Sequence, residues 1–179
     1  MKDTKTTLLS SDYILITIAV MGTNFVNYFF FSTLPIFAGL LTNTVRFAGF
    51  LSLAFSATAL VIRPLFGFIT DRYGRVKWII AGAAICAVSC MLYSFTTVLV
   101  LLLLIRILNG IGMSSSTTSA GAAIPDIIPK EKLAEGLGIF GLGTILAQAL
   151  GPTIALSIVA KGDLSSFKTL FYVATVFTT

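Results

Sequence analysis

The stretch GFITDRYGRVK, residues 67–77, separates two long apolar runs of the chain. It carries the charged side chains of Asp71, Arg72, Arg75 and Lys77, although charged residues make up only 11% of the sequence. Glycines stand at its first and eighth positions. A connector that is so strongly charged within an apolar chain predicts a structural or gating role of its own.

Composition places the chain among membrane proteins. Apolar residues make up 56% of it and aromatic residues 12%, whereas about one quarter of the residues of a typical soluble protein are charged. A spanning helix needs about 20 mostly apolar residues to cross ~30 Å of hydrocarbon. The sequence offers five such runs, at roughly 13–41, 47–70, 78–95, 97–124 and 135–160.

A sixth apolar run begins at Lys168 and continues to Thr179. A helix of this length extends only about 18 Å, which is less than the thickness of the hydrocarbon layer. We therefore expect an all-α membrane protein whose transmembrane bundle, residues 13–179, has six helices with the sixth one truncated. The chain would then be part of a longer protein.

The basic residues predict the orientation in the membrane. If the N-terminal tail, residues 1–12, is cytoplasmic, the connectors 71–77 and 124–135 also lie on the inner side. That side then holds Lys2, Lys5, Arg72, Arg75, Lys77, Lys130 and Lys132, and the outer side holds Arg46, Lys161 and Lys168. This distribution follows the positive-inside rule. It predicts a cytoplasmic N-terminus, and it explains the pI of 9.4 without nucleic acid as a partner. We expect the protein in the plasma (inner) membrane.

The residues that usually carry catalysis or bind metals are scarce. The chain contains no histidine, and Cys86 and Cys90 match no metal-ligand spacing. The sequence patterns of common hydrolases, nucleotide-binding proteins and zinc proteases are also missing. We therefore expect no enzyme activity, no cofactor and no metal site, and we interpret the cysteines as packing residues.

Asp71 is the charge in the stretch 67–77 that orientation does not explain. It falls at the C-terminal end of one predicted helix, where the helix dipole disfavours an acid by roughly 0.3–1 kcal/mol. Acids contribute little to membrane orientation. We expect Asp71 to meet either a neighbouring arginine or the N-terminus of another helix. Gly67 would let that helix approach closely, and Gly74 would permit the tight reversal.

This stretch resembles the loop between the second and third spans of the major facilitator superfamily, whose form is GxLaDrxGRrx. Six residues match that form: Gly67, Asp71, Arg72, Gly74, Arg75 and Lys77. The resemblance implies that the loop holds two halves of a transporter together on the cytoplasmic side during alternating access. The alternative is a charge cluster that only sets topology.

Arg106 lies about ten residues inside the fourth predicted span. A charge near the bilayer centre costs about 2.5–3.5 kcal/mol on the insertion scale, so it normally faces a cavity or a partner. Gly110, Ser114 and Thr118 follow at four-residue spacing and form a small, polar stripe that could line a water-filled path. The alternative is a structural Arg106 that pairs with a backbone carbonyl.

The segment RILNGIG, residues 106–112, is similar to the fourth-span motif RxxqGxg of the same family. Arg106, Gly110 and Gly112 match, and Asn109 replaces the common glutamine. The resemblance implies that Arg106 takes part in proton coupling or in binding an anionic substrate.

Arg63 lies seven residues before the inner end of the second predicted span, roughly 10 Å deep by helical rise. Its long side chain could reach the membrane surface, so structural and functional roles both stay open. Pro64 deprives the Leu60 carbonyl of its helical partner and predicts a bend.

The fifth predicted span carries small residues at four-residue spacing: Gly143, Ala147, Gly151 and Ala155. Such a seam predicts close contact with another helix. The segment AQALGPTIAL, residues 147–156, also resembles the fifth-span motif GxxxGPxxGG of drug antiporters in this family, with Gly151 and Pro152 in place. The resemblance favours antiport, and packing alone is the alternative.

Four amides lie within predicted spans: Asn24, Asn27, Asn109 and Gln148. Such groups either bond to other helices or face a substrate. If they faced one cavity, it would suit a fairly apolar or amphipathic small molecule. No acidic residue lies well inside a span, so a proton-carrying carboxylate would belong to the rest of the protein.

Together, the motifs identify the chain as the N-terminal half of a major facilitator transporter. The resemblance implies proton-coupled export of drug-like or other small organic molecules. Its partners would be the substrate, protons, the lipid bilayer and the missing C-terminal half. The alternatives are an uptake symporter for a sugar or organic acid, and a membrane scaffold or truncated product without transport.

Overall fold

The computed structural model describes residues 10–42 and 46–159, together with the single residues Phe167, Leu170 and Ala174. Its elements are α1 Ser11–Thr42, α2 Arg46–Tyr73, α3 Arg75–Phe95, α4 Leu99–Ile127, the short 3-10 helix η1 Lys130–Lys132, and α5 Leu133–Val159. The five α-helices are each long and apolar enough to cross a membrane. The five predicted spans are therefore confirmed as helices.

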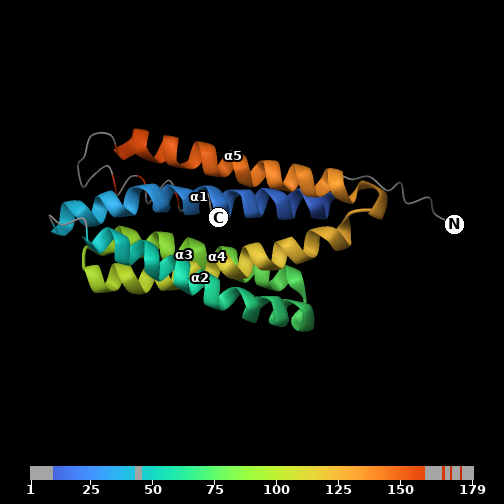
Figure 1. Cartoon of the computed structure of the whole chain (residues 1–179), viewed down its shortest axis with the longest axis horizontal. Coiled ribbons are helices and arrows are strands. Elements are labelled where there is room, and N and C mark those ends of the chain that lie inside the picture. The colour runs from blue at the N-terminus through green and yellow to red at the C-terminus, as the bar shows by residue number, and fades with distance from the viewer. Residues whose placement is uncertain (1–9, 43–45, 160–166, 168–169, 171–173, 175–179) are drawn as a thin grey trace.

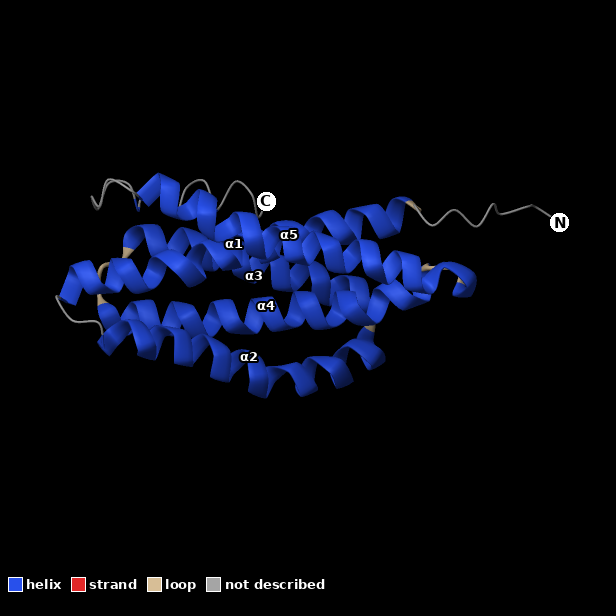
Figure 2. Cartoon of the chain, turned by 45° about the horizontal axis from the view of Figure 1, so that its top comes forward, coloured by secondary structure: helices blue, strands red, loops and turns tan. Residues whose placement is uncertain are grey.

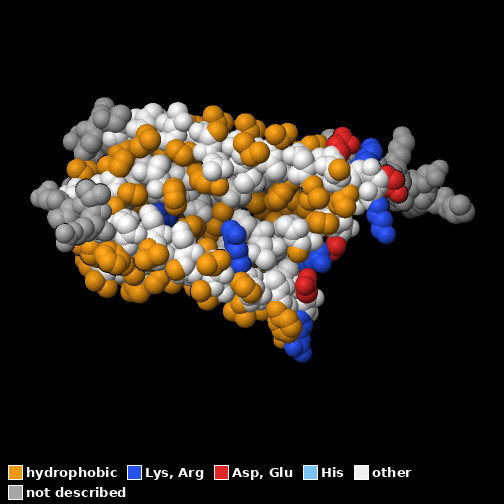
Figure 3. Space-filling view, in the orientation of Figure 1, with side chains coloured by type: hydrophobic (Ala, Val, Ile, Leu, Met, Phe, Trp, Pro, Cys, Tyr) orange, Lys and Arg blue, Asp and Glu red, His pale blue; other side chains and the backbone are white. Residues whose placement is uncertain are grey.

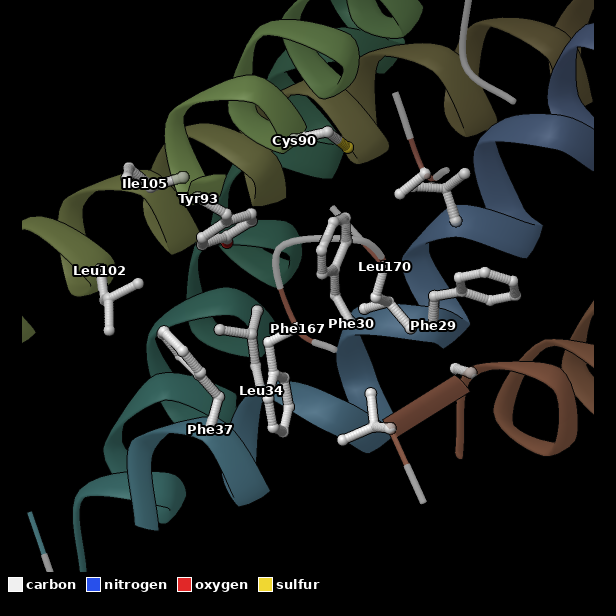
Figure 4. Packing of buried hydrophobic residues seen from close by; sticks show 14 of the residues in the cluster. Phe29, Phe30, Leu34, Phe37, Cys90, Tyr93, Leu102, Ile105, Phe167 and Leu170 are labelled. Atoms are coloured by element: carbon white, nitrogen blue, oxygen red, sulfur yellow. The ribbon is translucent and has the colours of Figure 1, made fainter. Parts of the chain in front are cut away.

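The predicted sixth helix, 168–179, lies outside the described residues apart from Leu170 and Ala174. These two and Phe167 each have helical backbone conformation. They pack in the same cluster as α1, where the rings of Phe37 and Phe167 are 5.1 Å apart (Figure 4).

The helices extend further at the charged end than the apolar runs predict. Only Gly74 separates α2 from α3, so most of the predicted connector 71–77 is helical. The connector 124–135 is also shorter than expected, and α1 already includes Ser11 and Asp12 of the predicted tail. Hydropathy marks the part of a helix that lies in hydrocarbon, whereas backbone hydrogen bonds continue the helix beyond it.

The helices run side by side along the long axis of the molecule (Figure 1). Helix α4 packs against both α2 and α3, and α1 packs mainly against α5. Helix α2, which contains Pro64, is visibly bent (Figure 2). Many of its outward side chains are large and apolar, as at Leu60 and Val61, each 72% exposed. Such a surface suits contact with lipid.

Two apolar clusters fill the interior. The first surrounds the phenylalanines of α1 and joins them to Tyr93 of α3 and Leu102 of α4 (Figure 4). The rings of Phe30 and Tyr93 lie 4.9 Å apart. The second cluster lies nearer the charged end and includes Tyr13, whose hydroxyl donates a hydrogen bond to the Gly136 carbonyl of α5 at 2.8 Å.

The closest helix crossing joins α3 and α4 at two glycines. A Cβ atom on Gly82 would lie 2.5 Å from the backbone nitrogen of Ser116 and 2.6 Å from the carbonyl oxygen of Gly112. A Cβ on Gly112 would lie 2.9 Å from the Gly82 carbonyl oxygen. The absence of both side chains lets the two backbones touch, as is common in membrane helix pairs.

Buried serines of α4 add polar links to its neighbours. Ser115 donates to the Trp78 carbonyl of α3 at 2.8 Å, and the hydroxyls of Ser119 and Thr70 of α2 lie 2.9 Å apart. In hydrocarbon, where water does not compete, such bonds contribute roughly 0.6–2 kcal/mol each. They help to fix the rotation of α4 against α2 and α3.

Candidate functional site

Gly74 forms the sharp junction between α2 and α3. Its φ is +91° and its ψ is 143°, and its N–H donates to the Thr70 carbonyl at 3.2 Å. Positive φ is a backbone region that glycine adopts easily and other residues avoid. The charged end of α3 therefore begins immediately after α2, and the side chains on both sides of Gly74 are held close together.

Replacing Gly74 with alanine should destabilise this junction by roughly 1–2 kcal/mol, because a Cβ disfavours positive φ. Thermal unfolding in detergent, followed by the fluorescence of Trp78, would measure the loss. Gly138→Ala is the matched control, since a Cβ there meets nothing within 4 Å in helix α5. Equal unfolding temperatures for the two variants would contradict the prediction.

Arg75 joins three helix ends at this junction. It is the first residue of α3, and its Nη1 contacts both the Ala122 carbonyl and the Asp126 carboxylate of α4. Its Nη2 lies 3.6 Å from Oδ1 of Asp71 in α2. Of the two partners considered for Asp71, the structure places the neighbouring arginine beside it. Sequence analysis did not identify Asp126 as a partner, because hydropathy assigned this residue to a connector.

No described residue covers the side of the junction that α2 forms. The Asp71 side chain stays 69% exposed despite its ion pair. A Cβ on Gly67, one turn earlier, would meet nothing within 4 Å. The close helix contact predicted at Gly67 is therefore not found in the described part of the chain. An exposed carboxylate and a half-buried glycine with open space beside it allow another element to approach here.

The other basic residues of the stretch 67–77 face outward. The guanidinium of Arg72 lies over the Tyr73 ring at 5.8 Å from its centroid. Lys77 is exposed and lines a surface cavity of 320 Å³ with Tyr73 and Trp78. Charged side chains gather at this end of the molecule, whereas most of the flank is apolar (Figure 3).

Arg106 is fully buried in the middle of the bundle, with 0% of its surface exposed. Its Nη2 donates to the Phe30 carbonyl of α1 at 2.9 Å, and the guanidinium lies 5.2 Å from the Phe55 ring centroid of α2. Tyr93 lies close enough for a polar interaction. Nε and Nη1 have no hydrogen-bond acceptor among the described residues. The carbonyl pairing expected of a structural arginine is present, but it uses only part of the guanidinium.

The small, polar stripe that follows Arg106 packs against α2. A Cβ on Gly110 would lie 3.1 Å from the Phe55 carbonyl oxygen, and the Ser114 hydroxyl donates to the Ala59 carbonyl at 3.1 Å. The expectation that this stripe lines a water-filled path is wrong for these two residues. Small residues suit helix contact as well as a path, and spacing alone does not distinguish the two.

The four amides do not form one group. Asn24 is buried and donates to the Val20 carbonyl of its own helix at 3.0 Å. Asn109 is also buried, and its Oδ1 lacks a partner among the described residues. Gln148 is exposed on α5. Asn27 lines a cavity between α1, α2 and α4, and none of the cavities described here is lined by more than one of the four amides.

Asn27 shares that cavity with Arg63. The cavity lies between α1, α2 and α4 and has a volume of 160 Å³. Arg63 is exposed and α2 continues to Tyr73, so Arg63 lies about 15 Å from the end of its helix. This distance along the helix exceeds the 10 Å to the predicted span boundary, because α2 continues beyond the apolar run.

The small-residue seam of α5 lies against α1. Ala147 and Ala155 are fully buried, and a Cβ on Gly151 would lie 3.0 Å from Cβ of Tyr28. A Cβ on Gly143 would be in ordinary contact with Sδ of Met21 at 3.6 Å. Pro152 lies within α5 and is half-buried. This part of the motif thus serves helix packing within the bundle.

Comparison with known proteins assigns the family. The sequence profile described as Major Facilitator Superfamily matches residues 15–179. The chain belongs to the major facilitator superfamily. It is therefore an integral membrane protein, and its bundle is part of the family's fold. Among the described residues, no group of three or more His, Cys, Asp and Glu is arranged to hold a metal ion.

Curated relatives include transporters of several organisms. The chain is 35% identical over 106 residues to an uncharacterised MFS-type transporter of Methanocaldococcus jannaschii, covering 59% of this chain and 27% of that protein. It is 30% identical to the staphylopine export protein of Staphylococcus aureus, covering 70% and 31%. It is 29% identical to the multi-drug resistance efflux pump PmrA of Streptococcus pneumoniae, covering 68% and 31%. The matches thus span about a third of each relative.

Proposed function

We propose that this chain belongs to a secondary active transporter that exports small organic molecules in exchange for protons. Membership of the major facilitator superfamily and similarity to an export protein and an efflux pump support this direction of transport. Two halves of the transporter rock around a central site, as in other secondary transporters built from repeats. The described helices form one side of that site.

The observation that carries the proposal is the junction around Gly74 and Arg75. Arg75 ties the ends of α2, α3 and α4 together, so these ends move as one body. Asp71 and Gly67 remain open on the adjacent surface. In the proposed mechanism, the second half of the transporter contacts this surface in one state and leaves it in the other.

The charged junction lies on the cytoplasmic side in this proposal, together with the N-terminus, and the protein resides in the plasma (inner) membrane. The described basic residues support this orientation, because Arg72, Arg75, Lys77, Lys130 and Lys132 all belong to one end of the bundle. An excess of Lys and Arg marks the cytoplasmic side of membrane proteins.

Everted membrane vesicles that contain the full-length protein would test the proposal. An imposed pH gradient should drive accumulation of an exported compound, and a protonophore should abolish it. A panel of dyes and drugs should include at least one transported compound. Accumulation in the opposite direction would indicate uptake by symport. Absence of movement across the panel in both directions would contradict the proposed transport.

Asp71→Asn should reduce transport at least tenfold, corresponding to about 1.4 kcal/mol in the conformational barrier. The amide has nearly the same shape but lacks the charge that meets the opposing half. Initial transport rates in vesicles would be compared at equal protein content, measured by immunoblot. Glu131→Gln, an exposed change in η1, is the control. Normal transport by Asp71→Asn would exclude a conformational role for the acid.

A further inference from the structure

We propose that the cavity between α1, α2 and α4 binds the negatively charged group of an amphipathic organic anion, with Arg63 as the binding cation. This inference rests on the proposed transport function and specifies the substrate class for it. The substrate would carry a carboxylate, sulfonate or phosphate beside an aromatic or other apolar body.

Arg63 is placed to meet a ligand rather than the aqueous surface. It lies about 15 Å before the C-terminal end of α2, a helix of 28 residues. It is exposed, in contrast to Arg106, which is fully buried. None of its contacts among the described residues is an ion pair. A charged side chain at this depth normally faces a substrate path or a partner.

The walls of the cavity combine one cation with apolar and aromatic groups. Tyr28 and Phe31 of α1, Phe55 of α2 and Met113 of α4 line it, together with the Asn27 amide. Its volume of 160 Å³ is below the roughly 300–1,000 Å³ of complete ligand sites. It can therefore hold one end of a ligand, while the remainder extends from the open side.

The charge distribution inside the bundle favours an anion. Arg63 and Arg106 are the two charged residues that lie away from the helix ends in the described part of the chain. The described acids all lie in terminal turns or connecting segments: Asp12, Asp71, Asp126, Glu131 and Glu135. Figure 3 accordingly shows acidic atoms at one end of the molecule and a basic group on the flank. A cationic ligand would find two arginines here and no carboxylate.

The positive charges of both arginines attract an anionic ligand in the cavity. Arg106 lies against the ring of Phe55, and the same ring lines the cavity that contains Arg63. Arg106 therefore adds a second positive charge behind one wall of the cavity. Arg63 can donate two parallel hydrogen bonds to a carboxylate or phosphate, and the aromatic walls accommodate the apolar body.

Two dyes with the same xanthene ring system and opposite charge would test this inference. Fluorescein is anionic at neutral pH, and tetramethylrhodamine methyl ester is cationic. Binding and accumulation of each would be measured in vesicles with the full-length protein and with Arg63→Gln, Arg63→Lys and Arg63→Glu. Lys130→Gln is the control, because it removes an exposed basic side chain outside the cavity.

We expect the protein to bind and export fluorescein, and Arg63→Gln to weaken its binding about tenfold or more, as loss of a charge-assisted hydrogen bond does. Arg63→Lys should retain part of the binding, and Arg63→Glu should shift the preference to the cationic dye. Export of the cationic dye that is unaffected by these changes would overturn the anion inference but support transport. If no compound of either charge moves, both proposals fail.

Discussion

Gly82→Leu should prevent α3 and α4 from packing, with a loss of about 3 kcal/mol or more. A Cβ at this position would lie 2.5 Å from the Ser116 backbone nitrogen and 2.6 Å from the Gly112 carbonyl oxygen. Backbone atoms cannot rotate away as a flexible side chain would, so the helices must separate. Because Ser115 and Trp78 are hydrogen-bonded beside this crossing, that link would be strained as well.

The yield of folded protein from gel filtration in detergent would measure this effect, together with thermal unfolding followed by the fluorescence of Trp78. Gly121→Leu is the matched control, since it lies in α4 where a Cβ would meet nothing within 4 Å. We expect the control to remain folded and Gly82→Leu to aggregate or to unfold at much lower temperature. Equal behaviour of the two variants would show that the described crossing is wrong.

Arg106→Met should give a folded protein that transports at least tenfold more slowly. Replacing a buried charge by an apolar side chain of similar size is often neutral or stabilising by about 1–4 kcal/mol. Two guanidinium nitrogens lack acceptors among the described residues, so the arginine is costly to bury. We infer that Arg106 has a role in transport. Its loss should lower the transport rate and leave the free energy of unfolding unchanged or higher.

Two further variants separate charge from packing at Arg106. Arg106→Ala should unfold more easily than Arg106→Met by about 2–5 kcal/mol, because it leaves a cavity beside Phe55. Arg106→Lys keeps the charge and should retain more transport than Arg106→Met. Unfolding temperature and initial transport rate would be measured on the same preparations. Full transport by Arg106→Met would assign the arginine a purely structural role.

The candidate site was only partly predictable from the sequence. The motif around Gly74 indicated both the tight reversal and the importance of Asp71, because a glycine at a charged helix junction is a local signal. Gly82 was missed, although it lies in the run AGAA, residues 81–84, whose small residues are typical of close helix contact. Asp126 gave no local signal, since its partner Arg75 is distant in the chain.

Local properties of the sequence determined the spans, the junction at Gly74 and the family of this protein. Apolar length and backbone freedom belong to single segments and are visible without a fold. The tertiary structure decided which faces meet: it packs the stripe after Arg106 against α2, pairs Arg75 with Asp126, and places Arg63 in a cavity with aromatic walls. In a membrane, faces toward lipid and faces toward other helices are both apolar. The sequence therefore does not show how each helix is rotated about its own axis, and only the packed structure does.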